Sequence, residues 1–185
     1  MYKKKLVFIF LFFILNVKNL IADDKTYIIQ KLNNTQSIKF SFKQTIRGAL
    51  EEGKCIIVFP KKLKCEYENK KIIILKDDRL AIIQERYSKI QYYPVSKSPF
   101  IKILDKDELI KLINLSTLTK LKNQIQLSNS LQSGDNFIIL FDKINYNLVG
   151  WKIRDKLNND VEFLIKIKSK NINIEENEFD IPSFN

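Results

Sequence analysis

Hydrophobic and polar positions alternate along most of the chain, with the two-residue period of half-buried β-strands. In residues 38–46, for example, Ile38, Phe40 and Phe42 alternate with lysines and serines. Short polar separators divide further runs of this kind, which favours an antiparallel meander. The predicted strands cover residues 38–46, 53–59, 63–67, 71–76, 80–84, 89–93, 136–141, 148–154, 161–167, 172–174 and 179–182.

Two segments have helical spacing instead. Residues 24–33 place apolar side chains on one face behind an acidic cap. Residues 99–115 begin with Pro99, which suits a first turn, and Asp105 with Glu108 forms a capping box. Neither helix is apolar enough to stand alone. The pattern therefore predicts a mainly β protein with helices (α+β), in which helices cover the concave face of a strongly curved antiparallel sheet.

The N-terminus has the pattern of an export signal. Three lysines precede the apolar stretch Leu6–Leu15, which is shorter than the roughly 20 residues that span a bilayer. We expect residues 1–22 to be a cleavable signal peptide, cut after the small residue Ala22, and residues 23–185 to be a single domain. The first cysteine is Cys55, so the processed chain has no N-terminal cysteine to accept a lipid.

The charge argues against a nucleic-acid partner. The whole chain carries a formal charge of +11, and removing the signal takes away four lysines and no acids, which leaves +7. The lysines occupy scattered, outward positions and form no compact basic cluster with interleaved aromatic residues. They indicate a solvated surface, with attraction to anionic membranes or an acidic partner as a weaker second meaning.

The residue types argue against enzymatic activity. The chain contains no histidine, the commonest general base and metal ligand, and it has no glycine-rich phosphate loop or nucleophile elbow. Two carboxylate pairs, Glu51 with Glu52 and Asp105 with Asp107, are explained more simply by turns and helix caps. We therefore expect a protein that is not an enzyme, with no catalytic residues, no metal site and no cofactor.

Cys55 and Cys65 lie symmetrically about Pro60, on opposite arms of a predicted hairpin. The register that pairs residue 57 with residue 63 also sets the two cysteines opposite each other. Such cross-strand neighbours are close enough for a disulfide, which an oxidising compartment would keep. Two buried free thiols are the alternative, and the spacing disfavours a redox role.

Several short motifs occur in an order typical of one family. They are Phe40-Ser41-Phe42-Lys43-Gln44, Glu52-Gly53 leading through Pro60 to Tyr67, Asp77-Asp78, Ser98-Pro99-Phe100, and Phe179-Asp180-Ile181-Pro182. With this set, the chain resembles the LolA family, periplasmic carriers of outer-membrane lipoproteins, over essentially its whole length after the signal. One departure is Phe59, which stands where the family commonly has an arginine that helps to hold its lid shut.

The resemblance implies an incomplete antiparallel β-barrel, or half-barrel, lidded by short helices. If the face that carries Cys55 and Cys65 points inward, the sheet residues of a cargo-binding cavity are Phe40, Phe42, Ile57, Phe59, Leu63 and Tyr67. The lid would contribute Phe100, Ile103, Leu104 and Leu112. Such residues mostly fill the core in any β-domain, and we expect Trp151 and Phe163 to be plain core.

The resemblance also implies a function and partners. The protein would be a monomeric periplasmic chaperone that carries the acyl chains of lipoproteins from the inner to the outer membrane. Its partners would be acylated lipoproteins, an inner-membrane ABC-type release complex, and an outer-membrane lipoprotein acceptor or that membrane itself. The alternatives are a periplasmic binder of another lipid or apolar ligand, and a structural envelope protein with a dry core.

Overall fold

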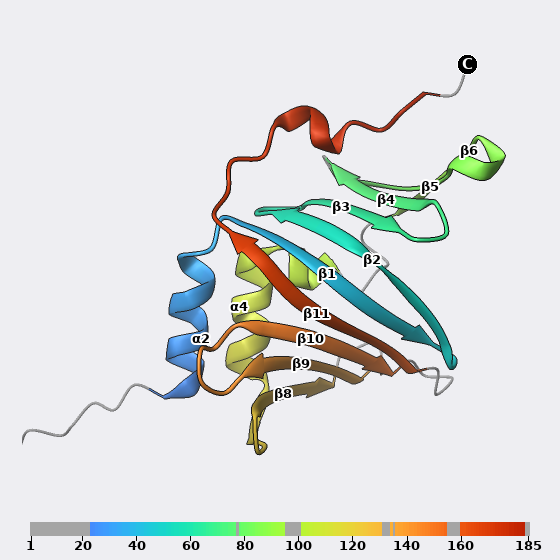
Figure 1. The fold of residues 1–185 in the computed structure, drawn as a ribbon. Coiled ribbons are helices and arrows are strands. Elements are labelled where there is room, and N and C mark those ends of the chain that lie inside the picture. The colour runs from blue at the N-terminus through green and yellow to red at the C-terminus, as the bar shows by residue number, and fades with distance from the viewer. Residues whose placement is uncertain are drawn as a thin grey trace, which may run out of the picture.

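The chain folds into one open antiparallel sheet with helices against its concave face (Figure 1). The computed structural model describes residues 23–76, 78–94, 101–130, 134, 136–154 and 160–183. The sheet is 11-stranded, with the order β6-β5-β4-β3-β2-β1-β11-β10-β9-β8-β7. The strands are β1 (Ser37–Ile46), β2 (Ala49–Val58), β3 (Lys62–Tyr67), β4 (Lys71–Lys76), β5 (Arg79–Gln84), β6 (Lys89–Pro94), β7 (Thr117–Lys120), β8 (Gln124–Ser130), β9 (Asn136–Asp142), β10 (Leu148–Arg154) and β11 (Asp160–Lys170). The predicted half-barrel with a helical lid is confirmed.

Three helices lie on the concave face: α2 (Asp24–Asn33), α3 (Ile101–Leu104) and α4 (Lys106–Leu115). Asp23 caps α2 by accepting from the backbone N–H of Thr26 at 2.8 Å. The predicted helix 99–115 is interrupted at Asp105, whose backbone is extended while its carboxylate accepts from the first N–H groups of α4. A cap residue must leave the helical conformation, so the capping signal divides the segment in two. Pro99 and Phe100 lie outside the described residues.

Strand β1 joins the two halves of the sheet. It pairs with β2, the next strand along the chain, and with β11, the last strand. Ile38, for example, lies opposite Ile57 on one side and Lys170 on the other. The β1–β11 pairing therefore connects a half-sheet built from β2–β6 with another built from β7–β11.

A row of aromatic rings crosses the concave face at this junction. Trp151 stacks on Phe163 with ring centroids 4.3 Å apart, and Phe163 stacks on Phe42 at 4.6 Å. Phe42 in turn meets the ring of Tyr67 edge to face at 4.8 Å. Gly53 of β2 lies between these last two residues and opposite both of them. Because glycine has no side chain, the rings of Phe42 and Tyr67 can meet above it.

The β-strands expected at residues 172–174 and 179–182 are absent, and this prediction is wrong. The segment instead carries the 3-10 helix η4 (Glu176–Phe179) between extended stretches. Its apolar side chains pack on the convex face of the sheet, which is the face away from the helices. Its backbone does not pair with an edge strand. Phe179 is buried against Ile74 and Ile83 there. We call residues 172–183 the C-terminal strap.

Ion pairs flank this second, smaller core. Each joins a lysine of the sheet to an acid of the strap, as in Lys62 with Glu176 at 2.6 Å and Lys64 with Glu178 at 3.0 Å. Exposed pairs of this kind contribute about 0–1 kcal/mol each. Burial of the Phe179 ring is therefore the larger contribution to holding the strap on the sheet.

Replacing Gly53 with alanine should destabilise the protein. A Cβ at this position would overlap the ring of Phe42 and the backbone oxygen of Glu66, and overpacking typically costs about 1–3 kcal/mol. Urea unfolding followed by Trp151 fluorescence measures the change. Gly48→Asn is the control, because space is open around Gly48 and asparagine tolerates its positive φ. A Gly53→Ala protein as stable as the control would contradict the steric role of Gly53.

Truncating Phe179 should release the strap. The Phe179→Ala change removes a ring that is 1% exposed, which costs about 3 kcal/mol, or roughly a hundredfold in the population of detached strap. Limited proteolysis within the strap should accelerate accordingly. Glu178→Gln, which removes only an exposed ion pair, should change the cleavage rate little. Equal rates for the two variants would show that the strap is held by charge.

Candidate functional site

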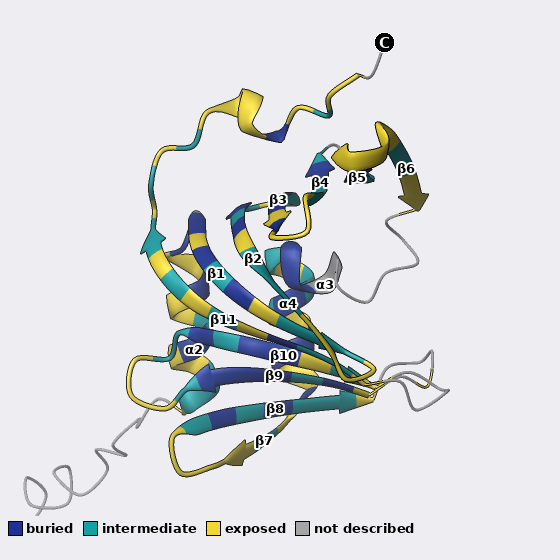
Figure 2. Ribbon diagram, turned by 45° about the vertical axis from the view of Figure 1, so that its right-hand side comes forward, coloured by how far each residue is buried: buried dark blue, intermediate teal, exposed yellow. Residues whose placement is uncertain are grey.

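The candidate site is the apolar concave face of β1, β2 and β3. Strand register places Phe40 opposite Cys55 and Ile57 opposite Leu63 on this face. The alternate positions on the convex face hold lysines in both β1 and β3, together with Ser41 and Glu66, while β2 contributes Glu52, Lys54, Ile56 and Val58 there. The alternation that predicted the strands corresponds to buried positions alternating with more exposed ones along β1 and β3 (Figure 2).

The helices cover this face with apolar side chains of their own. Ile28 of α2, Ile103 of α3, and Leu109 and Ile113 of α4 are fully buried against the sheet. The spacing of Leu109 and Ile113, four residues apart, places both on one side of α4. The sheet and helices together enclose one continuous apolar core.

The structure brings the predicted cavity residues together. Eight of them are buried members of this core: Phe40, Phe42, Ile57, Leu63, Tyr67, Ile103, Leu104 and Leu112. Phe59 is partly buried and packs against the same cluster. Trp151 and Phe163 belong to it as well, through the aromatic row. Phe100 is outside the described residues, and the rest form a closely packed layer between sheet and helices.

Cys55 and Cys65 occupy the same inward face. Their Sγ atoms form a disulfide that links β2 to β3 within the core. The two residues are directly opposite each other in the register, with Ile57 opposite Leu63 as the next inward pair. The disulfide thus sits among the side chains that we assigned to the cargo-binding face.

A polar cluster bounds the apolar face on the side of β4. The Tyr67 hydroxyl donates to the Gln44 side-chain oxygen at 2.8 Å, and burial raises the pKa of Tyr67 above its usual value, with a smaller contribution from Glu51. The Lys71 ammonium pairs with Glu51 at 2.7 Å and lies 3.9 Å from the centre of the Tyr67 ring. The apolar part of the face ends at this cluster.

The carboxylates at 51 and 52 are not turn residues, contrary to the sequence-based interpretation. Both lie within strand β2, so their side chains point to opposite faces. Glu51 points inward to Lys71, and Glu52 points outward to Lys43 at 2.7 Å. The other pair fits the interpretation better, because Asp105 does cap a helix. The strand role of Glu51 was missed because β2 begins at Ala49, four residues before the predicted start.

A pocket of about 990 Å³ lies at the ends of β8, β9, β10 and β11, beside the turn between β1 and β2. Leu115 at the end of α4 lines it together with Phe137, Ile153 and Val161. Charged pairs surround these apolar side chains, including Lys152 with Glu162 and Arg154 with Asp160. None of the predicted cavity residues lines this pocket. Its Leu115 side chain is 79% exposed, so an apolar surface is open to solvent next to the buried core.

Sequence reasoning missed this pocket because two of its strands were not predicted. Thr117 of β7 and Ser128 of β8 both line it. Strand β8 does alternate, with Ile125 and Leu127 buried between polar residues. This alternation, with only two apolar positions, is the weak sequence signal that could have predicted β8 and, with it, the pocket.

Few polar contacts hold α3 and α4, which we call the lid, to the β2–β3 turn. The Lys61 N–H donates to the Leu104 carbonyl at 2.9 Å, and the Lys61 ammonium is 3.8 Å from the Asp105 carboxylate. The Lys106 ammonium lies 5.3 Å from the centre of the Phe59 ring, within the range of a cation–π contact. All of these contacts join the turn to the junction between α3 and α4.

A lysine of α2 ties the other end of the lid. Lys25 donates to the backbone oxygens of Asn114, in the last turn of α4, and of Ser116, its C-cap, at 2.9 and 2.7 Å. Carbonyls at a helix C-terminus lack partners within the helix and carry partial negative charge, so an ammonium is favourable there. The lid is thus attached at both ends, with apolar packing between them.

An open antiparallel half-barrel with an apolar concave face under helices is the architecture of a binding or carrier protein. The outer membrane lipoprotein carrier protein LolA family matches residues 33–182 of the chain. The chain therefore belongs to the LolA family. No curated protein matches its sequence.

Solved structures share the fold at low identity. An uncharacterized conserved protein from Thermus thermophilus is 8% identical with a TM-score of 0.53, and the match covers 86% of this chain and 95% of that one. The MucA/MucB complex of Pseudomonas aeruginosa is 10% identical with a TM-score of 0.50, covering 87% and 62%. A LolA superfamily protein from Nitrosomonas europaea is 8% identical with a TM-score of 0.45, covering 86% and 99%.

The described residues contain neither a cluster of metal-binding side chains nor a helix that could span a membrane. No group of three or more histidine, cysteine, aspartate or glutamate side chains in this part of the chain could hold a metal ion. No helix among the same residues is both long and apolar enough to cross a membrane.

Replacing Lys25 with methionine should loosen the lid. The change keeps the aliphatic stem but removes two hydrogen bonds to carbonyls at the C-terminal end of α4, a loss of about 1 kcal/mol at a partly exposed site. Hydrogen exchange in α4 should then be about fivefold faster. Lys31→Met, on the same helix and with an exposed side chain, is the control. Unchanged exchange in the Lys25 variant would show that packing alone holds the lid.

Proposed function

We propose that this protein is a periplasmic carrier that shelters the acyl chains of lipoproteins on its concave face and moves them from the inner to the outer membrane. The observation that carries the proposal is the continuous apolar layer between the sheet and helices held by few polar contacts. Membership of the LolA family supports it.

The physical need for such a carrier follows from the hydrophobic effect. Each methylene exposed to water costs about 0.8 kcal/mol, so an acyl chain of roughly 16 carbons costs on the order of 10 kcal/mol. Lipoproteins carry two or three such chains. A protein that buries the chains during transit removes this cost without catalysing any reaction.

The buried state of Ile57, Leu63 and Leu112 makes cargo and lid competitors for the same surface. In this proposal the arrangement with the lid packed on the sheet is the closed form of the protein. Cargo binding must break lid-to-sheet contacts, which lowers the net affinity and allows release to an acceptor. The pocket beside Leu115 offers a place where the first methylenes can contact apolar side chains before the lid opens.

In this chain the contacts around Phe59 take over the role of the family's arginine. A phenylalanine cannot donate hydrogen bonds to the lid as a guanidinium can. Its ring instead faces Lys106 of α4, while the neighbouring Lys61 N–H bonds to Leu104. These weaker contacts favour a lid that opens readily when an acyl chain arrives.

The proposal also names the partners and the compartment. The signal at residues 1–22 would direct the chain to the periplasm, where the Cys55–Cys65 disulfide is stable. The donor would be an inner-membrane ABC-type release complex. The recipient would be an outer-membrane lipoprotein acceptor or the membrane itself.

The decisive experiment combines release with cross-linking. The purified protein is incubated with spheroplasts, and lipoproteins should appear in the soluble fraction. A photo-reactive phenylalanine analogue at Phe42, which points inward, should cross-link to the lipoprotein acyl chains. The same analogue at Lys43, the next residue on the outward face, should not.

Three outcomes would contradict the proposal in different ways. If no lipoprotein is released, the carrier function fails. If Phe42 captures only free lipids, the protein binds another apolar ligand on the same face. If Lys43 captures acyl cargo and Phe42 does not, the assignment of the concave face is wrong.

A further inference from the structure

We propose that the convex face of β1, β2 and β11 is a docking surface for anionic phospholipid membranes, centred on a shallow groove around Ser41. The groove has a volume of about 310 Å³ and lies on the side of the sheet away from the helices. This inference does not depend on what the concave face carries.

Strand register surrounds Ser41 with ammonium groups. Ser41 of β1 lies directly opposite Lys54 of β2 and Lys166 of β11. Neighbouring strands place such side chains about 5 Å apart at their Cβ atoms, so both lysines can reach one phosphate above the serine. The Ser41 hydroxyl is half-buried and makes no hydrogen bond with the described part of the chain, so it is available to donate to a phosphate oxygen.

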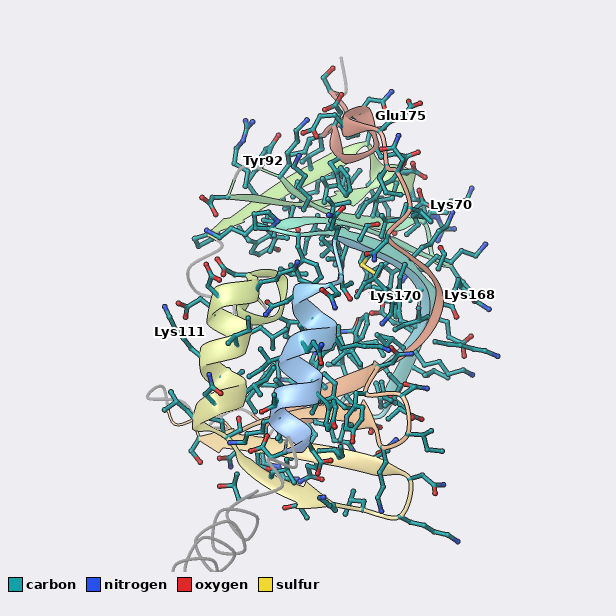
Figure 3. All side chains as sticks on the ribbon, turned by 90° about the vertical axis from the view of Figure 1, so that its left-hand side faces the viewer. Lys70, Tyr92, Lys111, Lys168, Lys170 and Glu175 are labelled. Atoms are coloured by element: carbon teal, nitrogen blue, oxygen red, sulfur yellow. A yellow bond between two sulfur atoms is a disulfide. The ribbon has the colours of Figure 1, made fainter. Side chains whose placement is uncertain are left out.

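Further lysines extend this site into a basic surface. Lys39 and Lys168 are exposed on the same side, and Figure 3 shows Lys168 projecting away from the helices. None of the four lysines, Lys39, Lys54, Lys166 and Lys168, makes an ion pair within the described residues. Glu66 lies across from Lys54 but is paired with Lys64 at 3.2 Å.

The remaining acids at the groove leave its charge positive. Glu52 is neutralised by Lys43 at 2.7 Å. Glu68 lies at the edge and is the one further acid in the lining. Among the described residues, the face therefore carries four lysines without ion pairs and one carboxylate without an ion pair, that of Glu68. This excess of positive charge attracts anions to the face.

The spread of the lysines favours a membrane over a single small anion. Lys39, Lys54, Lys166 and Lys168 come from three adjacent strands, so one phosphate cannot contact them all, whereas a bilayer presents a plane of phosphates. Leu164 lines the groove and is 37% exposed, and Leu50, four residues before Lys54 on β2, is 58% exposed. Lysines with exposed leucines suit the boundary between headgroups and acyl chains.

Docking by this face would bring the pocket close to the bilayer. Thr45 lines the pocket and lies four residues beyond Ser41 on the same strand, which is about 13 Å at roughly 3.3 Å per residue. The strand ends that border the pocket, including Thr45, Lys152 and Glu162, would therefore lie near the membrane surface, whereas Leu115 of α4 lies on the concave side. The helices would remain on the opposite side.

Vesicle flotation tests the proposal. The whole chain is expressed in a Gram-negative host, purified from the periplasmic fraction and mixed with vesicles of phosphatidylcholine alone or with phosphatidylglycerol added. It should float with the anionic vesicles in low salt, and lose this binding at about 1 M salt, where the screening length is about 3 Å. The triple variant Lys39→Gln, Lys54→Gln, Lys166→Gln should bind at least about tenfold more weakly, since each lysine contributes about 1 kcal/mol at such a surface.

A matched variant separates the face from the net charge. Arg86→Gln, Lys89→Gln, Lys122→Gln also removes three exposed charges, from the β5–β6 connection, the first residue of β6 and the β7–β8 connection, and should bind like the parent protein. Equal losses in the two variants would attribute binding to overall charge and overturn the proposal. Absence of binding to anionic vesicles would overturn it too, and would leave an acidic protein as the partner of this face. Circular dichroism of each variant checks that it is folded.

Discussion

The aromatic row from Trp151 to Tyr67 holds the curved sheet together where its two halves meet. Each half-sheet is built from neighbours in sequence, but the β1–β11 junction depends on side chains that are far apart in the chain. The rings fill the concave face there, and Gly53 leaves the space that they need. The covering helices, the pocket and the basic outer face all take their positions from this junction.

The apolar concave face is covered by the protein's own helices. A cavity permanently open to water would expose this apolar surface, which costs free energy. A lid that packs on the concave face buries the same side chains when no ligand is bound. How easily the concave face can be uncovered then depends on how weakly the lid is attached, more than on the shape of the lid. The contacts of Phe59, Lys61 and Lys25 are few and lie at its two ends.

The sequence predicted much of the fold because local alternation is strong in the first half of the chain. The symmetry of Cys55 and Cys65 about Pro60 was sufficient to give the hairpin register found in the structure. Nine of the ten residues predicted to line a cavity lie in the described part of the chain and pack together in one layer, but periodicity alone cannot distinguish a packed layer from a cavity wall. Strands β7 and β8, and with them the pocket, lacked enough apolar residues to be predicted.

The C-terminal strap shows why other predictions failed. Ile172 and Ile174 have the spacing of a strand, but a strand also needs a partner edge, which local sequence does not reveal. The run Ile72–Leu75 held a further clue, because four consecutive apolar residues in a strand indicate burial on both faces. The helices cover one face, and the strap is the element that covers the other.

The pairing of β1 with β11 also determines when the fold can be completed. Strand β1, near the start of the domain, pairs with β11, near its end. Most of the chain must therefore be synthesised before the two half-sheets can join. Contacts of such long sequence separation slow folding, because a large loop must close before they form. Each half-sheet, built from strands adjacent in sequence, can therefore form before the β1–β11 pairing joins the two.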